Sequence, residues 1–419
     1  MKHQLCRCLL LSGLLTLAAE ASTYEGIGPD DWAGWRGPTH NGIAAEGQNL
    51  PTEWSEEKNI QWKVALPGRG HASPTVVGEF IYLPTADEKA QTQSILCLNR
   101  ETGKLIWSQQ INEGGFDDDG HQRKSHASPS IACDGERLFA NFVHHGAVHT
   151  FALDLKGKLL WQQRISKFVT HQGYGASPFL YQDLVIVCSD NKAGGAVVAM
   201  KRDSGKIVWR RERPEEPNYV SPVVFNVAGR DQLLLSGCNL VTSLEPQTGE
   251  TIWEVPGSTT ECVVTMVTDG ERVFTSGGYP KNHTVALMGD GSGEVVWQNS
   301  TRVYVPSMII YQKHAFAVAD AGFAVCWDSA SGKQIWKERL GGDFFSSPVL
   351  ADGHIYATNI RGLTYVYRAD PNDFKIVGKN QLGNEVYASP VICNDRIYLR
   401  VAHIDETRQE FLYCIGLSH

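Results

Sequence analysis

The stretch SHASPSIACDGERLF, residues 125–139, recurs in altered form along this 419-residue chain. Related stretches are GHASPTVVGEFIY from Gly70, FSSPVLADGHIY from Phe345 and YASPVICNDRIY from Tyr387. Each contains a Ser-Pro step, a short apolar run, a turn-forming pair of residues and a second apolar run, which is typical of two strands joined by a tight turn. Recurrence of such a unit at a nearly fixed interval indicates a repeat architecture.

The Ser of each Ser-Pro step marks the position of a unit. These markers are Ser73, Ser128, Ser177, Ser221, Ser347 and Ser389. Two diverged copies, beginning at Val263 and Ser307, fill the long gap between the fourth and the next marker. The successive intervals are 55, 49, 44, 42, 44, 40 and 42 residues, so the chain contains eight units.

A second marker follows in most units: a Gly, three further residues and then a Trp. It ends at Trp107, Trp161, Trp209, Trp253, Trp297 and Trp336. In the seventh unit Gly378 stands where the Trp is expected, and the chain ends before the eighth unit can supply one. The missing segment lies at the other end of the chain, where NIQWKVALPG, residues 59–68, carries Trp62.

These patterns predict an all-β fold, an eight-bladed β-propeller of four-stranded antiparallel blades. A single four-stranded sheet exposes both faces, and radial stacking of such sheets buries them. We expect the strand around Trp62 to complete the last blade and close the ring. The recurring Trp is large enough to fill the gap between neighbouring sheets.

The chain divides into three parts. Residues 1–21 read as a signal peptide, with Lys2 and Arg7 before the apolar stretch Leu9 to Ala19 and a small-residue cleavage site ending at Ala21. The alternative, a membrane anchor, would need about 20 apolar residues. Residues 22–58 form an extended lead-in that we expect to wrap the outside or cap one face, and residues 59–419 form the propeller.

Export and cleavage leave a mature chain with 36 basic and 45 acidic side chains, a formal charge of −9. This balance disfavours nucleic acid as a partner. Eight cysteines remain, without a CxxC pair, and they are expected to be single thiols, with one or two disulfides as the alternative. The mature chain has no expected transmembrane segment, and we predict a periplasmic or extracellular monomer.

The spacing around the Trp residues is tighter in four units. A small residue, a polar residue two positions later, a Gly and a Trp recur in Cys97–Trp107, Ala199–Trp209, Ser243–Trp253 and Cys326–Trp336. This pattern resembles the tryptophan-docking repeat of the PQQ-like (pyrroloquinoline-quinone) β-propeller family, over about residues 59–417. That family includes quinoprotein alcohol dehydrogenases and BamB-like scaffold proteins. The lead-in resembles that of secreted, planctomycete-type members.

The resemblance implies two functions. A quinoprotein dehydrogenase is expected to carry adjacent cysteines in a vicinal disulfide and a Glu/Asn/Asp calcium site with a catalytic Asp, and a covalent haem requires CxxCH. The sequence has no Cys-Cys pair and no CxxCH. It therefore favours an exported, non-enzymatic binding or scaffold protein with a protein partner in the cell envelope and no cofactor. The alternative is a PQQ-dependent oxidoreductase with quinone and calcium at the funnel mouth.

Candidate ligand-binding residues share a position in their units. His71 and His126 stand two residues before their Ser, and His171 lies slightly earlier in the third unit. Equivalent positions reach equivalent heights in a propeller, so these histidines are predicted to face one rim. The other residues of this candidate rim site are Tyr219, Glu261, Phe345 and Tyr387. The alternative is that all of them are solvated or hydrogen-bonded residues of the inner strands.

Two further candidates are weaker. Residues 116–126 form an insertion that we interpret as a solvated charged loop; Asp117, Asp118 and Asp119 could hold calcium, but the remaining ligands of a calcium loop are not recognisable. His144 and His145 are predicted to lie at a hairpin tip. We assign no catalytic residue and no metal ligand from the sequence.

Overall fold

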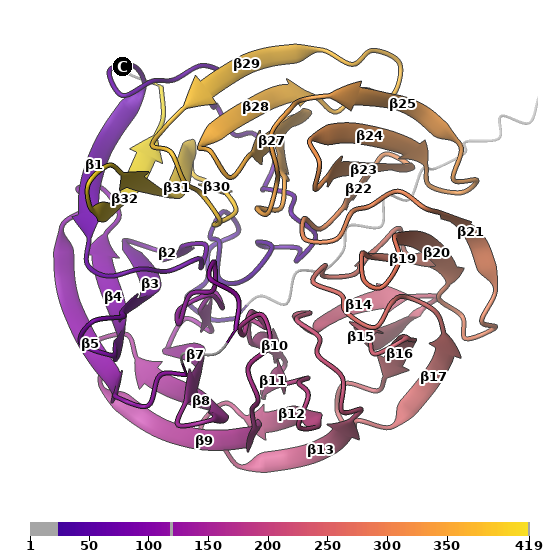
Figure 1. The fold of residues 1–419 in the computed structure, drawn as a ribbon, viewed down its shortest axis with the longest axis horizontal. Helices are drawn as coiled ribbons and strands as arrows, with labels where there is room; N and C mark the ends of the chain where they lie inside the picture. The colour runs from indigo at the N-terminus through magenta and orange to yellow at the C-terminus, as the bar shows by residue number, and fades with distance from the viewer. Residues whose placement is uncertain (1–23, 118–119, 418–419) are drawn as a thin grey trace, which may run out of the picture.

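The computed structural model describes residues 24–117 and 120–417, and it contains eight four-stranded antiparallel sheets arranged in a ring (Figure 1). The predicted all-β, eight-bladed propeller is therefore confirmed. The predicted signal peptide, residues 1–21, and Asp118 and Asp119 lie outside the described residues. No helix in the described part of the chain has the length and apolar character needed to cross a bilayer.

We number the blades 1 to 8 along the chain and give the strands of each blade from the innermost to the outermost. Blade 1 comprises β2 (Thr75–Val77), β3 (Phe80–Asp87), β4 (Thr92–Asn99) and β5 (Leu105–Glu113), and blade 2 comprises β6 (Ala132–Cys133), β7 (Arg137–His144), β8 (Ala147–Asp154) and β9 (Leu159–Lys167). Blade 3 comprises β10 (Phe179–Tyr181), β11 (Leu184–Cys188), β12 (Gly195–Lys201) and β13 (Ile207–Arg213), and blade 4 comprises β14 (Val223–Val227), β15 (Arg230–Gly237), β16 (Leu240–Leu244) and β17 (Thr251–Pro256).

Blades 5 to 8 follow the same order. Blade 5 comprises β18 (Val267–Thr268), β19 (Arg272–Gly277), β20 (His283–Met288) and β21 (Val295–Asn299), and blade 6 comprises β22 (Ile309–Tyr311), β23 (His314–Ala319), β24 (Phe323–Asp328) and β25 (Gln334–Arg339). Blade 7 comprises β26 (Val349–Ala351), β27 (His354–Thr358), β28 (Leu363–Arg368) and β29 (Ile376–Gln381), and blade 8 comprises β30 (Val391–Cys393), β31 (Arg396–Ile404), β32 (Arg408–Ile415) and β1 (Ile60–Leu66).

The ring closes as predicted, because β1 pairs antiparallel with β32, with Trp62 opposite Cys414. A buried arginine connects blade 8 to blade 1 at the same seam. Arg400 and Glu410, both of blade 8, are each 2% exposed and lie 2.6 Å apart. Arg400 also donates to the carbonyl oxygen of Pro84 in blade 1, at 2.7 Å. The ion pair holds Arg400 within blade 8, and its hydrogen bond to Pro84 links the last blade to the first.

Each outer-strand Trp packs against the blade that follows it. The indole N–H of Trp62 donates to the Arg100 carbonyl of blade 1 at 3.0 Å, and a Cβ at Gly103 would lie 2.6 Å from the same indole ring. Gly103 also has a φ of +68°, which L side chains rarely adopt, so two physical reasons favour Gly there. Equivalent indole-to-carbonyl bonds are made by Trp107, Trp161, Trp209, Trp297 and Trp336. Trp253 differs, since it donates to Gln232 of its own blade.

Blade 7 lacks this Trp, and the lead-in supplies one. Trp54 stacks on Tyr356 of β27, with ring centroids 6.3 Å apart. In blade 6 the outer-strand Trp336 lies 6.0 Å from Phe316, which occupies the same position in its sheet as Tyr356. A Cβ at Gly378 would lie 1.9 Å from the carbonyl oxygen of Thr52. The small residue in β29 therefore makes room for the lead-in, whose Trp54 replaces the absent side chain.

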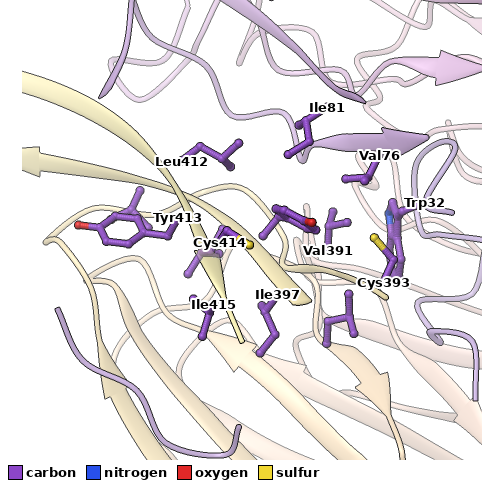
Figure 2. Close-up of a cluster of buried hydrophobic side chains, with 14 of the residues drawn as sticks. Trp32, Val76, Ile81, Val391, Cys393, Ile397, Leu412, Tyr413, Cys414 and Ile415 are labelled. Atoms are coloured by element: carbon purple, nitrogen blue, oxygen red, sulfur yellow. The ribbon is translucent and has the colours of Figure 1, made fainter. Parts of the chain in front are cut away.

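The lead-in also crosses the centre of one face of the ring (Figure 1). In antiparallel blades, the turns between strands one and two and between strands three and four lie on one face, which we call the turn face. The other connections form the loop face. Trp32 pairs with Val76 of blade 1, and Ile43 pairs with Leu350 of blade 7. Figure 2 shows the Trp32 ring beside Val76 and Cys393 in the core between blades 1 and 8.

Arg36 binds the lead-in to backbone carbonyls beside the inner strands of two blades. It is 2% exposed and donates to the carbonyl oxygens of Pro348 in blade 7 and Met308 in blade 6. Trp35 donates to the Thr265 hydroxyl of blade 5 at 2.7 Å. The lead-in therefore contacts inner strands on several sides of the channel and closes it at the turn face.

Candidate functional site

Hydrogen bonds between marker residues link seven of the eight neighbouring blade pairs in the described part of the chain; between blades 4 and 5, the Thr265 hydroxyl instead accepts from Trp35 of the lead-in. The backbone N–H of the marker Ser in one blade donates to the hydroxyl oxygen of the next blade's marker, as from Ser177 to Ser221 at 2.9 Å. The same bond joins Ser73 to Ser130, Ser130 to Ser177, Thr265 to Ser307, Ser307 to Ser347, Ser347 to Ser389 and Ser389 to Ser73. This circumferential bonding explains why Ser recurs, which the sequence repeat alone did not reveal.

These bonds also correct the register of two units. The sequence placed their markers at Ser128 and Val263, whereas the structure uses Ser130 and Thr265, each two residues later. In the second unit one Pro stands between two serines, and Ser128 instead donates to the carbonyl of Ser125. In the fifth unit Thr265 replaces the Ser, so the Ser-Pro pattern was absent. His126 therefore does not share the position of His71 in its blade.

Three of the predicted residues form a row of rings on the loop face, which we call the aromatic row. His71, Tyr387 and Phe345 come from the connections that lead into the inner strands of blades 1, 8 and 7. The ring centroids of His71 and Tyr387 lie 4.1 Å apart, and those of Tyr387 and Phe345 lie 5.9 Å apart. The guanidinium of Arg123, from the insertion after blade 1, lies 5.6 Å from the Phe345 centroid. Half-buried rings beside a cation can stack against a planar or apolar ligand group.

The surroundings of His71 keep its imidazole neutral. Burial lowers its pKa well below the ordinary value, and Arg69, Arg408 and Arg400 lower it further. The His71 Nε2 and Arg69 Nε atoms are buried without a hydrogen-bond partner among the described residues. Arg408 is itself paired with Glu385 and Glu410. The site therefore offers a neutral imidazole and an incompletely bonded guanidinium beside the aromatic row.

A second cluster gathers around Glu261, which is 4% exposed. Its carboxylate accepts a hydrogen bond from the Tyr304 hydroxyl at 3.0 Å and lies 3.3 Å from His171 Nε2. Lys192 lies 3.0 Å from the other ring nitrogen of His171. Burial, and next the charge of Glu261, raise the pKa of Tyr219, whose hydroxyl is buried without a partner among the described residues. The cluster therefore places a buried carboxylate whose nearest partners are Tyr304 and His171 next to the Tyr219 hydroxyl, which lacks a partner in the described part of the chain.

His126 lies apart from both clusters. Its ring stacks on Phe116 with centroids 4.0 Å apart, and it lines a cavity that also borders Tyr174 and Lys124. Burial, followed by the charge of Lys124, lowers its pKa. The structure thus places the seven predicted rim residues in three groups: His71 with Phe345 and Tyr387, His171 with Glu261 and Tyr219, and His126 with the insertion.

Sequence analysis missed several residues of these groups. Arg123 belongs to the insertion that was interpreted as a solvated loop, and Tyr304 lies one residue before Val305, the position equivalent to the rim residues. Lys192 follows a strand in blade 3 and carries no repeat signal. Tyr304 lies 43 positions after Glu261, and Lys192 lies 21 positions after His171. These pairs meet only through the fold, so no local pattern in the sequence could have pointed to them.

The residues present do not fit a calcium-bound quinone. The eight described cysteines are all free and buried, so the alternative of one or two disulfides among them is not realised, and no two of them are adjacent in sequence. Within residues 24–117 and 120–417, no group of three or more His, Cys, Asp or Glu side chains could hold a metal ion. Glu261, one of the buried carboxylates of the loop face, is already engaged by Tyr304 and His171. This donor set differs from the one that the family resemblance implies for PQQ.

Comparison with known proteins agrees with the repeat pattern. A family model described as outer membrane protein assembly factor BamB matches residues 42–167, 91–288 and 281–373, which together exceed half of the chain. The chain belongs to this family. The predicted resemblance to PQQ-like, BamB-type propellers is thereby confirmed.

The similar proteins include an outer membrane protein assembly factor and dehydrogenases. BamB from Burkholderia pseudomallei is 24% identical over 78% of this chain and 83% of its own length. A polyvinylalcohol dehydrogenase from Pseudomonas is 23% identical over 83% of this chain, which spans only 50% of that relative. Solved structures with the same fold include BamB from Moraxella catarrhalis, with a TM-score of 0.58 and 12% identity over 84% of this chain and 99% of that one. A europium-containing methanol dehydrogenase gives 0.66 and 10% identity over 93% and 98%.

Proposed function

We propose that this protein is an exported, non-enzymatic β-propeller that binds a protein partner in the cell envelope, in the manner of BamB-type scaffolds. The observation that carries the proposal is the contrast between the two ends of the channel. The lead-in closes the turn face with Arg36 and Trp35, whereas the loop face presents the half-buried aromatic row beside Arg69 and Arg123. Aromatic and arginine side chains are the types enriched at the centres of protein interfaces.

A PQQ-dependent oxidoreductase is the second candidate. It is supported by the similarity to polyvinylalcohol dehydrogenase and by the fold shared with methanol dehydrogenase. The donor set described above argues against it. The two candidates differ in what the loop face should bind: a protein surface in the first case, and a planar quinone with calcium in the second.

Site-specific photo-crosslinking in intact cells tests the first candidate. A photoreactive phenylalanine analogue at Tyr387 should give one discrete protein adduct, and the adduct should weaken when Arg123→Glu is added. The same analogue at Thr251, an exposed outer-strand position, is the control and should give none. Equal adducts at both positions, or none at Tyr387, would contradict a partner at the loop face.

A further inference from the structure

The outer wall of the first three blades carries large exposed aliphatic side chains at equivalent positions. They form three consecutive pairs at the starts of β5, β9 and β13, which are the outermost strands of their sheets. The exposed fractions are 51% for Leu105, 48% for Ile106, 44% for Leu159, 43% for Leu160, 36% for Ile207 and 43% for Val208. We call these six residues the aliphatic belt. Grouped exposed apolar side chains on a soluble protein mark interaction sites.

A row of positive charge accompanies the belt. An exposed lysine directly precedes each aliphatic pair, and these residues are Lys104, Lys158 and Lys206. In the part of the chain that the structure describes, none of the three ammonium groups forms an ion pair. A partner that covers the belt would therefore complement it best by bringing carboxylates next to apolar side chains.

The belt is specific to blades 1 to 3. The equivalent pair is Thr251 and Ile252 in blade 4 and Gln334 and Ile335 in blade 6, each with one polar member. In blade 5, Val295 is 46% exposed but its neighbour Val296 is half-buried. A repeat kept only for packing between blades would expose similar side chains all around the ring.

Blade 7 shows how this chain covers the same positions. There the equivalent pair, Ile376 and Val377, is half-buried, and Val377 packs with the core that contains Trp54 of the lead-in. The backbone N–H of Trp54 donates to the side-chain oxygen of Asn380 at 2.8 Å, and the side-chain amide of Asn380 donates to the Thr52 carbonyl at 3.0 Å. The covering segment makes a tight turn at Ser55–Lys58, and it carries Glu53, Glu56 and Glu57 on either side of its Trp. Lys58 pairs with Glu53, and Lys63 pairs with Glu56.

We propose that the aliphatic belt binds a short acidic segment of a partner protein, with an aromatic or aliphatic side chain lying on the belt and carboxylates facing Lys104, Lys158 and Lys206. On blade 7 the lead-in covers the equivalent pair with a segment that carries three glutamates. Its Trp54 fills the docking position that Trp107, Trp161 and Trp209 occupy in blades 1 to 3, so the comparison extends only to the acidic cover and not to the Trp. This surface is on the outer wall and is distinct from the aromatic row. A negative result for binding at the aliphatic belt therefore does not contradict binding at the aromatic row, and the reverse also holds.

A peptide with the lead-in sequence LPTEWSEEKN, residues 50–59, is a suitable probe. Fluorescence anisotropy of the labelled peptide is titrated with the mature protein, with Leu160→Ser, with Lys158→Glu and with Ile335→Ser as the matched control in blade 6. We expect both belt variants to raise Kd at least fivefold and the control to stay within twofold. A peptide whose three glutamates are replaced by lysine should not bind. Because all substituted side chains are exposed, thermal unfolding should show unchanged folding.

Other outcomes overturn the proposal. Binding that is equal for all variants would mean that the peptide displaces the lead-in at blade 7, and absence of binding would mean that the belt recognises no such segment. If the protein sediments with vesicles of phosphatidylglycerol and phosphatidylcholine, and Leu160→Ser abolishes this sedimentation but not peptide binding, the belt would be assigned to a lipid surface. A concentration-dependent dimer that Leu160→Ser abolishes would assign it to a second copy of this chain.

Discussion

The two ends of the central channel are built differently from the same repeated strands. At the turn face, the lead-in binds main-chain groups of several blades and buries Trp32, and its continuation buries Trp54 against the outer strand of blade 7. At the loop face, the half-buried rings of His71, Tyr387 and Phe345 contact one another and a nearby cation. The difference indicates that the first end stabilises the ring, whereas the second can exchange its side-chain contacts for those of a partner. Substitutions at the two ends should therefore separate stability from binding.

Removal of Trp54 should have the largest effect on stability. Trp54→Ala deletes a buried ring that stands in for the missing blade 7 side chain, and large buried aromatic residues cost about 4 kcal/mol when truncated to Ala. Urea denaturation followed by fluorescence measures this difference. Trp54→Phe keeps most of the stacking on Tyr356 and is the control. A loss below about 1 kcal/mol for Trp54→Ala would show that the lead-in does not contribute to the propeller core.

Arg36 should come next. Arg36→Met keeps the length of the side chain but leaves the carbonyls of Pro348 and Met308 without its hydrogen bonds, and bonds to a charged group contribute roughly 2–3 kcal/mol. The expected result is a lower midpoint in urea together with faster proteolysis between residues 24 and 58. Unchanged proteolysis of that segment would contradict the role of Arg36 in closing the turn face.

Acidification should weaken the same end by a smaller amount. Burial lowers the pKa of His40 to about 4, against a weaker opposing effect of the Trp35 carbonyl, while an unfolded His titrates near 6.5. Between these values the folded state binds fewer protons than the unfolded state, so this contribution is complete above pH 6.5 and declines as the pH falls toward 4. The full shift corresponds to about 3 kcal/mol, and solvent screening reduces this figure because His40 is only half-buried. His40→Phe should flatten the dependence of unfolding free energy on pH. An identical slope in both proteins would refute the assignment.

The loop face should show the smallest effect on stability and the clearest effect on binding. Tyr387→Ala removes a half-buried ring and should change the free energy of unfolding by less than about 1 kcal/mol. The adduct formed by a crosslinker at the neighbouring Phe345 should disappear in the same variant. A large loss of stability without loss of the adduct would reverse the proposed roles of the two ends.

The repeat in the sequence was sufficient to predict the ring. Ser-Pro steps and the Gly-to-Trp spacing recur at similar intervals, and the match of Trp62 to the missing eighth strand predicted the closure that the pairing of β1 with β32 confirms. The role of Gly378 could not be predicted, because the residue that replaces its Trp, Trp54, lies more than 300 positions earlier in the chain. Local spacing carries no information about such a contact.

The candidate site was harder to predict for a similar reason. A repeat gives the height of a residue in its blade, but a shift of two residues in the second unit separated His126 from His71. Contacts between loops, such as Arg123 with Phe345 or Tyr304 with Glu261, depend on loop paths that the repeat does not determine. The predicted residues were therefore correctly assigned to inner-strand connections but not to their separate groups.

The measurement that tests the central claim most directly is thermal unfolding of the mature protein with and without PQQ and calcium. A ligand that binds only the folded state raises its stability by RT ln(1 + [L]/Kd), so a bound quinone would raise Tm in a concentration-dependent way. A binding protein without this cofactor predicts no change in Tm at saturating PQQ and calcium. A rise that grows with PQQ concentration and disappears on removal of calcium would contradict the account and assign the loop face to a quinone.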